Sequence, residues 1–248
     1  MNRLQPEIPT LVQASSLIFS GTVVKLGASS VANLPPRDNF AVVRVDRSLR
    51  SDPALGNLSD RLITVALVER GELQLHQQIV FFAVDWIHGG GIAAREVAHV
   101  NTRLEDEINS NLEQLPERHL AERLSTSVLV IAAKVRSIKR TPFDVRWRNA
   151  PQWAITSFNI LDALRGRATE NTTVLFPTSN RPTWRSSPRL SKGQGGIFLL
   201  HRPPAWPQLP EFEGFLTSEA FTTLDPADVQ PESQRLLVEK LLGQVGAP

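Results

Sequence analysis

An internal repeat constrains the fold of this 248-residue chain more than any other feature of the sequence. Four short blocks recur in the same order, at separations of 111, 115, 109 and 117 residues. One such match could arise by chance, because β-strands draw on a small set of residue types. Four ordered matches at nearly one separation indicate a duplicated unit. The blocks pair residues 15–25 with 126–136, 43–50 with 158–165, 63–67 with 172–176, and 77–83 with 194–200.

The repeated blocks have the composition of β-strands. The first and last blocks of each copy are short β-branched, aliphatic or aromatic runs bounded by Gly, Ser or polar residues, which is typical of buried strands. Around residues 40–45, apolar and polar side chains alternate, as in a half-buried strand. Gly71 and Gly193 precede the last strand of each copy, and we expect both in turns with positive φ. The sequence therefore predicts a mainly β protein of two tandem OB-like barrels, each with a short flanking helix.

Helical periodicity appears outside these blocks. Leu104, Ile108, Leu112 and Leu115 form a stripe spaced by four, four and three residues. Pro116-Glu117 is expected to open a second short helix through Leu124, because proline suits the first helical position. At the C-terminus we expect a helix over 231–243, whose apolar face consists of Leu236, Leu237 and Leu241. These helices predict two domains, residues 1–116 and 117–248, each ending in a helix.

The order of these strands resembles that of netrin-like (TIMP-like) OB-fold domains. The resemblance rests on a strand ending in small residues, the Phe40-to-Arg50 strand, a short Val-rich strand and a final strand that joins glycine to an aromatic residue. It covers roughly residues 11–100 and 121–202. The metalloprotease inhibitors of that family use an N-terminal cysteine to bind the zinc of their target. This chain has no cysteine, so the resemblance implies the fold alone.

Several kinds of chemistry lack the residues they need. The absence of cysteine excludes disulfides, thiolate catalysis and cysteine-ligated metals. The five histidines form no H-x-x-x-H or H-E-x-x-H pattern, which excludes a zincin site. There is no G-x-S-x-G nucleophile elbow, and the Gly193-to-Gly196 run lacks the Lys-Ser/Thr of a phosphate loop. We therefore expect a protein that is not an enzyme and needs no cofactor.

One alternative is a metal site at a hairpin. Asp85 and His88 precede the glycine-rich tip at Gly89–Gly91, and His99 lies on the returning strand, so the three could meet around a metal. A glycine-rich tip with polar flanks is more often only a turn, and we expect no metal.

The composition of the chain indicates the cytoplasm, because the chain lacks cysteine, an N-terminal apolar signal and an apolar run longer than Ile79–Val84. No membrane association is expected.

Charge is distributed unevenly along the chain. Residues 1–116 carry 10 Lys and Arg against 13 Asp and Glu, residues 117–202 carry 15 against 5, and residues 203–248 carry 2 against 7. The net charges are therefore −3, +10 and −5. A basic segment of this kind predicts contact with an acidic surface, although a solvated arginine-rich face would have the same composition.

The basic residues are interleaved with tryptophans in two long loops of the second copy. The candidate binding residues are Lys139, Arg140, Arg146, Trp147, Arg148, Trp184, Arg185, Arg189 and Lys192. We expect a non-enzymatic intracellular interaction protein, such as an adaptor, scaffold or regulatory subunit, that contacts an acidic protein partner through these loops. The alternative is binding of single-stranded nucleic acid or another polyanion by the basic second barrel, since OB-folds stack bases on aromatic rings beside a cationic groove. No small-molecule substrate is expected.

Overall fold

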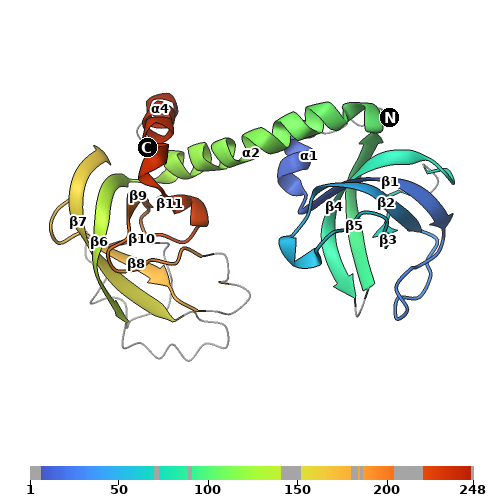
Figure 1. The fold of residues 1–248 in the computed structure, drawn as a ribbon, viewed down its shortest axis with the longest axis horizontal. Coiled ribbons are helices and arrows are strands. Elements are labelled where there is room, and N and C mark those ends of the chain that lie inside the picture. The colour runs from blue at the N-terminus through green and yellow to red at the C-terminus, as the bar shows by residue number, and fades with distance from the viewer. Residues whose placement is uncertain are drawn as a thin grey trace. The chain divides into compact units, whose positions relative to one another are not determined.

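The computed structural model describes residues 7–69, 73–88, 91–140, 152–179, 184, 187–203 and 220–246. These residues form a mainly β protein with two sheets and several helices, as the sequence predicts (Figure 1). The chain divides into two compact units, Met1–Pro116 and Glu117–Pro248, and each unit is described by itself.

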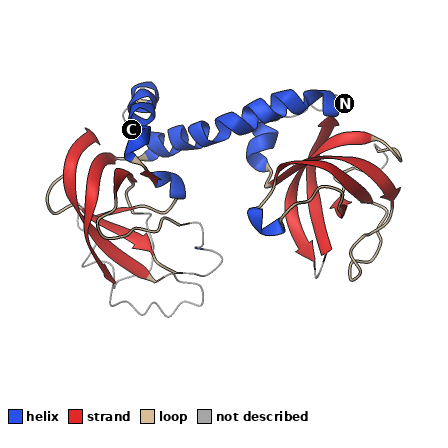
Figure 2. Cartoon of the chain, viewed as in Figure 1, coloured by secondary structure: helices blue, strands red, loops and turns tan. Residues whose placement is uncertain are grey.

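The first unit is a closed five-stranded barrel (Figure 2). Its elements are α1 (Ile8–Ala14), β1 (Leu17–Leu26), β2 (Phe40–Arg50), η1 (Pro53–Leu55), β3 (Leu62–Ala66), β4 (Gln78–His88), β5 (Gly91–Asn101), η2 (Thr102–Leu104) and the first part of α2 (Glu105–Thr126). The strand order is β1-β2-β3-β5-β4. Phe19 and Phe81 stack inside the barrel with ring centroids 5.2 Å apart. Outside it, α1 and α2 cover Ile18, Val80 and Phe82.

The second unit holds a six-stranded sheet in the order β10-β8-β7-β6-β9-β11. Its elements after α2 are β6 (Leu129–Arg140), β7 (Trp153–Arg165), β8 (Thr173–Pro177), β9 (Gly195–Leu200), β10 (Ala220–Thr222), η4 (Pro226–Asp228), β11 (Val229–Gln230), η5 (Glu232–Gln234) and α4 (Arg235–Val245). Phe158 and Phe198 meet in its core, with ring centroids 4.7 Å apart. The end of α2 and α4 cover Val130 and Leu199 on the outer face.

The strand registers confirm the repeat at the level of single residue pairs. When equivalent strand pairs of the two units are compared, each residue of β7 follows its counterpart in β2 by 115 positions. The same separation is 109 for β3 and β8 and 117 for β4 and β9, as predicted. The separation of β1 and β6 is 112, one more than predicted, because Gly21↔Val45 corresponds to Ala133↔Ile160. The prediction was wrong by one residue here because successive residues at the start of β1, Leu17–Phe19, are apolar and buried, so the pattern there does not fix which of them face inward.

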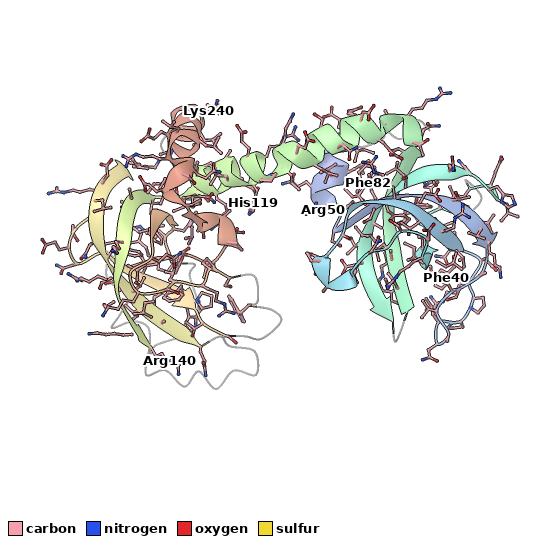
Figure 3. The ribbon with its side chains drawn as sticks, in the orientation of Figure 1. Phe40, Arg50, Phe82, His119, Arg140 and Lys240 are labelled. Atoms are coloured by element: carbon pink, nitrogen blue, oxygen red, sulfur yellow. The ribbon has the colours of Figure 1, made fainter. Side chains whose placement is uncertain are left out.

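Each unit uses an arginine at the end of its second strand to cap the helix that precedes its first strand. Arg50 Nη1 donates to the carbonyl of Val12 at 2.8 Å, and Arg165 Nη1 donates to the carbonyl of Leu124 at 2.5 Å (Figure 3). Both carbonyls lie in the last turn of a helix, where backbone acceptors have no partner within the helix. The same contact in both units explains why the Leu-Arg ending recurs in the sequence.

A second equivalent contact appears with its charges exchanged. In the first unit Arg47 of β2 pairs with Glu105, the first residue of α2, at 3.8 Å. In the second unit Asp162 of β7 pairs with Arg235, the first residue of α4. The positions correspond because Ser20↔Arg47 matches Ala132↔Asp162, and because both helices follow a three-residue 3-10 turn after the closing strand.

The units differ most in the strand that closes the sheet. In the first unit β5 pairs along its whole length with β4 and in parallel with β3. In the second unit two short strands take the place of β5: β10 pairs with β8, and β11 pairs with β9. The segment that joins β10 to β11 occupies the position where β5 of the first unit has a one-residue bulge at Val97. The isolated bridge His201↔Thr222 matches the pair Val84↔Arg95. The second sheet therefore has the strand arrangement of the first barrel with its closing strand divided in two, and its described strands form a half-barrel instead of a closed barrel.

Two helix predictions require correction. Pro116 does not start a new helix but lies inside α2. A proline there removes one backbone hydrogen bond, but buried Ile108 and Leu124 anchor the helix on either side of it. In α4 the buried residues are Val238 and Leu241, whereas Leu236 is 81% exposed. Val238, Leu241 and Val245 are spaced by three and four residues and pack together with the predicted Leu237, so only Leu236 was placed wrongly on the apolar face.

Candidate binding surface

The predicted basic residues that the structure describes do not all lie on loops. Lys139 and Arg140 are the last two residues of β6 and are exposed (Figure 3). Lys192 is exposed in the turn before β9. Arg146, Trp147, Arg148 and Arg185 lie outside the described residues.

Trp184 and Arg189 take part in packing within the second unit. Trp184 meets the buried Trp153 edge-on, with ring centroids 6.0 Å apart. Arg189 Nη2 donates to the carbonyl of Ser179 at 2.6 Å. Trp184 therefore contacts β7 through Trp153, and Arg189 is bonded to a residue just after β8, so the indole of Trp184 already has an aromatic neighbour.

Two basic residues that the sequence analysis missed extend the surface along β6. Lys134 and Arg136 are exposed on the outer side of the strand, between inward Ala133 and Val135. Alternation along a strand places them on the face opposite the core. Lys134 Cε approaches Gly193 at the end of the turn that holds Lys192. The signal was present in the sequence as the alternation of basic and apolar residues in the first repeated block.

We call Lys134, Arg136, Lys139 and Lys192 the cationic face; Arg140, the residue after Lys139, points to the other side of the strand at its end. None of them forms an ion pair with a residue in the described part of the chain. The strand positions span about 17 Å from Lys134 to Lys139, given a rise of about 3.3 Å per residue. Several unneutralised cations over this length produce a positive potential suited to an extended acidic surface.

The equivalent face of the first unit is not basic. Thr22 and Val24 occupy the positions of Lys134 and Arg136, according to the register of β1 and β6. Asp46 on the neighbouring strand accepts a hydrogen bond from Thr22 at 2.7 Å and pairs with Arg44 at 3.4 Å. The cationic face is therefore a property of the second copy and not of the shared fold.

The second unit also contains a buried carboxylate. Asp228 is fully buried and accepts bonds from Arg123 at 2.7 and 2.9 Å and from the amides of Leu224 and Asp225 at 3.0 Å. Its Oδ1 also lies 3.0 Å from His201 Nε2. Burial alone would raise the pKa of Asp228, but the hydrogen bonds from His201, Arg123 and the Asp225 amide outweigh burial and lower it. This carboxylate anchors the turn before β11 to α2 and β9.

A comparable polar pair lies in the first barrel. The bulge at Val97 brings Glu96 and His99 to the same side of β5, and the buried Glu96 Oε1 lies 2.5 Å from His99 Nδ1. Its other oxygen accepts the amide of Val68 at 2.8 Å. Both closing strands are thus interrupted at a bulge or insertion that holds a buried carboxylate beside a histidine.

The possible metal site at the first hairpin does not form. Asp85 pairs with Ala94 and hydrogen-bonds Ser16, whereas His99 pairs with Phe81, four residues further along β4. That separation is about 13 Å along the strand. Among the residues whose positions are described, no three His, Asp or Glu side chains are grouped to hold a metal.

No helix in the described ranges has the length and apolar character needed to cross a membrane.

Comparisons with known proteins do not identify the chain. No protein-family model matches it, and no curated protein is significantly similar to it. The candidate function therefore rests on the surface itself.

Proposed function

We propose that this chain is a non-enzymatic intracellular interaction protein whose second unit binds an acidic protein partner through the cationic face. The observation that carries the proposal is the set of Lys and Arg side chains along β6 that form no ion pair with a described residue, at strand positions where the first unit has the uncharged Thr22 and Val24. A rigid strand holds the charges in register, which lowers the entropy lost on binding.

An acidic protein surface is favoured over single-stranded nucleic acid. Sequence-blind binding of single strands combines cations with aromatic rings on which bases stack. Trp184 already packs against Trp153, and the described part of the cationic face consists of Lys and Arg alone. Charge without stacking suits carboxylates, which accept charge-assisted hydrogen bonds from Lys and Arg.

The test compares charge reversal on the cationic face with a matched change elsewhere. The variant Lys134→Glu/Lys139→Glu should lose the partners that the wild-type chain captures from its host. The control Lys25→Glu/Arg61→Glu reverses two exposed charges in the first unit and should retain them. Capture by the wild type should weaken as salt rises, because exposed charge pairs are screened. A partner bound equally by both variants would contradict the proposal.

A second measurement addresses nucleic acid directly. Anisotropy titrations with mixed-sequence single-stranded DNA and RNA should show at most weak binding that falls steeply with salt, by about 0.7 in log K per phosphate contact for each unit of log salt. A tight complex that survives about 0.3 M salt would favour the nucleic-acid alternative, since electrostatic binding alone weakens strongly over this range.

A further inference from the structure

The first unit contains a cavity on the outer side of its barrel. The cavity has a volume of about 440 Å³ and is formed by α1, β5 and the start of α2. Ile8, Pro9, Leu11 and Leu104 contribute apolar walls, and exposed Glu7 and Glu107 contribute carboxylates. Polar and apolar groups contribute similarly to the lining, which also includes His99, and the cavity is partly open to solvent; its volume falls in the range of ligand pockets.

The second unit fills the equivalent position with its own chain. The separation of 112 residues between β1 and β6 also aligns the helices before them, so Glu7 corresponds to His119 and Leu11 to Arg123. In the closing strands, the pairings with β4 and β9 show that Ala98 corresponds to Asp228. His119 Nε2 lies 3.0 Å from Asp225 Oδ1, and Arg123 pairs with Asp228. The turn at residues 224–227 therefore packs against the same helix positions that line the cavity in the first unit. Only the single residue Val97 stands in its place there, so the space stays open.

The charges around this position differ in sign between the units. In the second unit the helix supplies His119 and Arg123, and the inserted turn is acidic. In the first unit the carboxylates Glu7 and Glu107 stand beside the cavity, and neither forms an ion pair with a described residue. A turn that filled this cavity in the same manner would need a cation where the second unit has Asp225.

We propose that the cavity binds a short turn of a partner polypeptide that carries lysine or arginine. The aliphatic stem of that side chain packs against Leu11 and Leu104, and its charge lies beside Glu7 and Glu107. The inference rests on the proposed function, since it assumes an interaction protein. It assigns the first unit a basic partner segment, whereas the second unit takes an acidic one.

The test uses the full chain and a peptide derived from the turn of the second unit. The peptide acetyl-Thr-Leu-Lys-Pro-Ala-amide reproduces residues 223–227 with lysine at the position of Asp225, and the matched control keeps aspartate. NMR titration of the ¹⁵N-labelled chain should show that the lysine peptide shifts the amides of Ala98 and Val100 and binds at least about tenfold more tightly than the aspartate peptide, since like charges repel.

Three variants and one control variant locate the site. Glu7→Gln and Glu107→Gln should each weaken the lysine peptide roughly fivefold, the effect of one partly exposed ion pair. Glu113→Gln, which removes an exposed carboxylate of α2 away from the cavity, should have no effect. Ala98→Leu should abolish binding by filling the cavity, with the unshifted remainder of the spectrum showing that the barrel is folded.

Three results would overturn the proposal: no shifts with the lysine peptide, equal affinity for both peptides, or binding indifferent to Glu7, Glu107 and Ala98. The outcome is separable from that of the proposed function. The variant Lys134→Glu/Lys139→Glu should bind the lysine peptide as the wild type does. Retention of the acidic partner by this variant would contradict only the role of the cationic face, whereas the peptide results alone decide the inference about the cavity.

Discussion

Replacing the Arg123–Asp228 pair by the residues of the first unit should cost much less than breaking it. The repeat supplies the substitutions, because Leu11 and Ala98 stand at the equivalent positions. We consider Arg123→Leu, Asp228→Ala and the double variant. Each single change leaves one member of the pair without its partner, whereas the double change restores an apolar contact that the fold already tolerates.

The magnitudes follow from burial and hydrogen bonding. Breaking a buried ion pair by removing one partner typically costs about 3–5 kcal/mol. Asp228→Ala should cost about 3–4 kcal/mol, because Arg123 is partly exposed and water can reach it. Arg123→Leu should cost about 2–3 kcal/mol, since His201 and two amides still bind the carboxylate. The double variant should cost about 2 kcal/mol, mainly for the unpaired amides of Leu224 and Asp225.

Tryptophan fluorescence during urea unfolding can isolate the second unit. Four of the five tryptophans, Trp147, Trp153, Trp184 and Trp206, belong to it, and Trp86→Phe removes the one in the first unit. Measurement in this background separates the two units, which need not unfold in one transition. The sum of the two single costs should exceed the double cost by about 3–5 kcal/mol. Additive costs would refute the view that the pair acts as a unit.

Three further predictions can be checked by the same unfolding measurements. The pKa of Asp228 is lowered in the folded state, so its contribution to the free energy of unfolding is complete above the unfolded pKa of about 3.9 and is lost as pH falls through the folded pKa. The urea midpoint of the second unit should therefore drop below about pH 4. In Asp228→Ala the midpoint should depend less on pH. Arg235→Glu should lower the midpoint by opposing Asp162, and adding Asp162→Arg should restore it; failure of the second change to rescue the first would contradict their pairing. Gly166→Ala should cost about 1–2 kcal/mol, because φ is +76° and a Cβ would lie 2.6 Å from the Val128 carbonyl, whereas Gly195→Ala, with open space around it, should stay within about 0.5 kcal/mol.

The sequence predicted the mainly β fold and most of the repeat because local patterns encode them. Strands β2, β3 and β4 and their counterparts were aligned correctly. The positive φ predicted for Gly193 is observed at 85°, but its counterpart in the first unit is His76 at 65°, while Gly71 lies outside the described residues. The positions of glycine therefore predicted only one of the two left-handed residues, because a histidine adopts the left-handed conformation at the same turn of the first unit.

The divided closing strand could not be predicted from local pattern. β10 and β11 are three and two residues long, and the turn between them contains Pro226. Such short strands are recognised only through their partners, β8 and β9, which are distant in sequence. For the same reason the Arg123–Asp228 pair was missed, since 105 residues separate its members. On the cationic face, Lys134 and Arg136 lie on strand β6 and not in the loops where basic residues alternate with tryptophans, so the loop pattern did not include them.

The exchanged ion pairs have a consequence for how a duplicated chain avoids assembling incorrectly. Two similar sheets and two similar helices on one polypeptide could dock in the wrong combination during folding. In such a mismatch Glu105 of α2 would face Asp162, and Arg235 of α4 would face Arg47. Both wrong combinations place like charges together, while both correct ones place opposite charges together. An exposed pair that adds little to stability can still direct each helix to its own sheet.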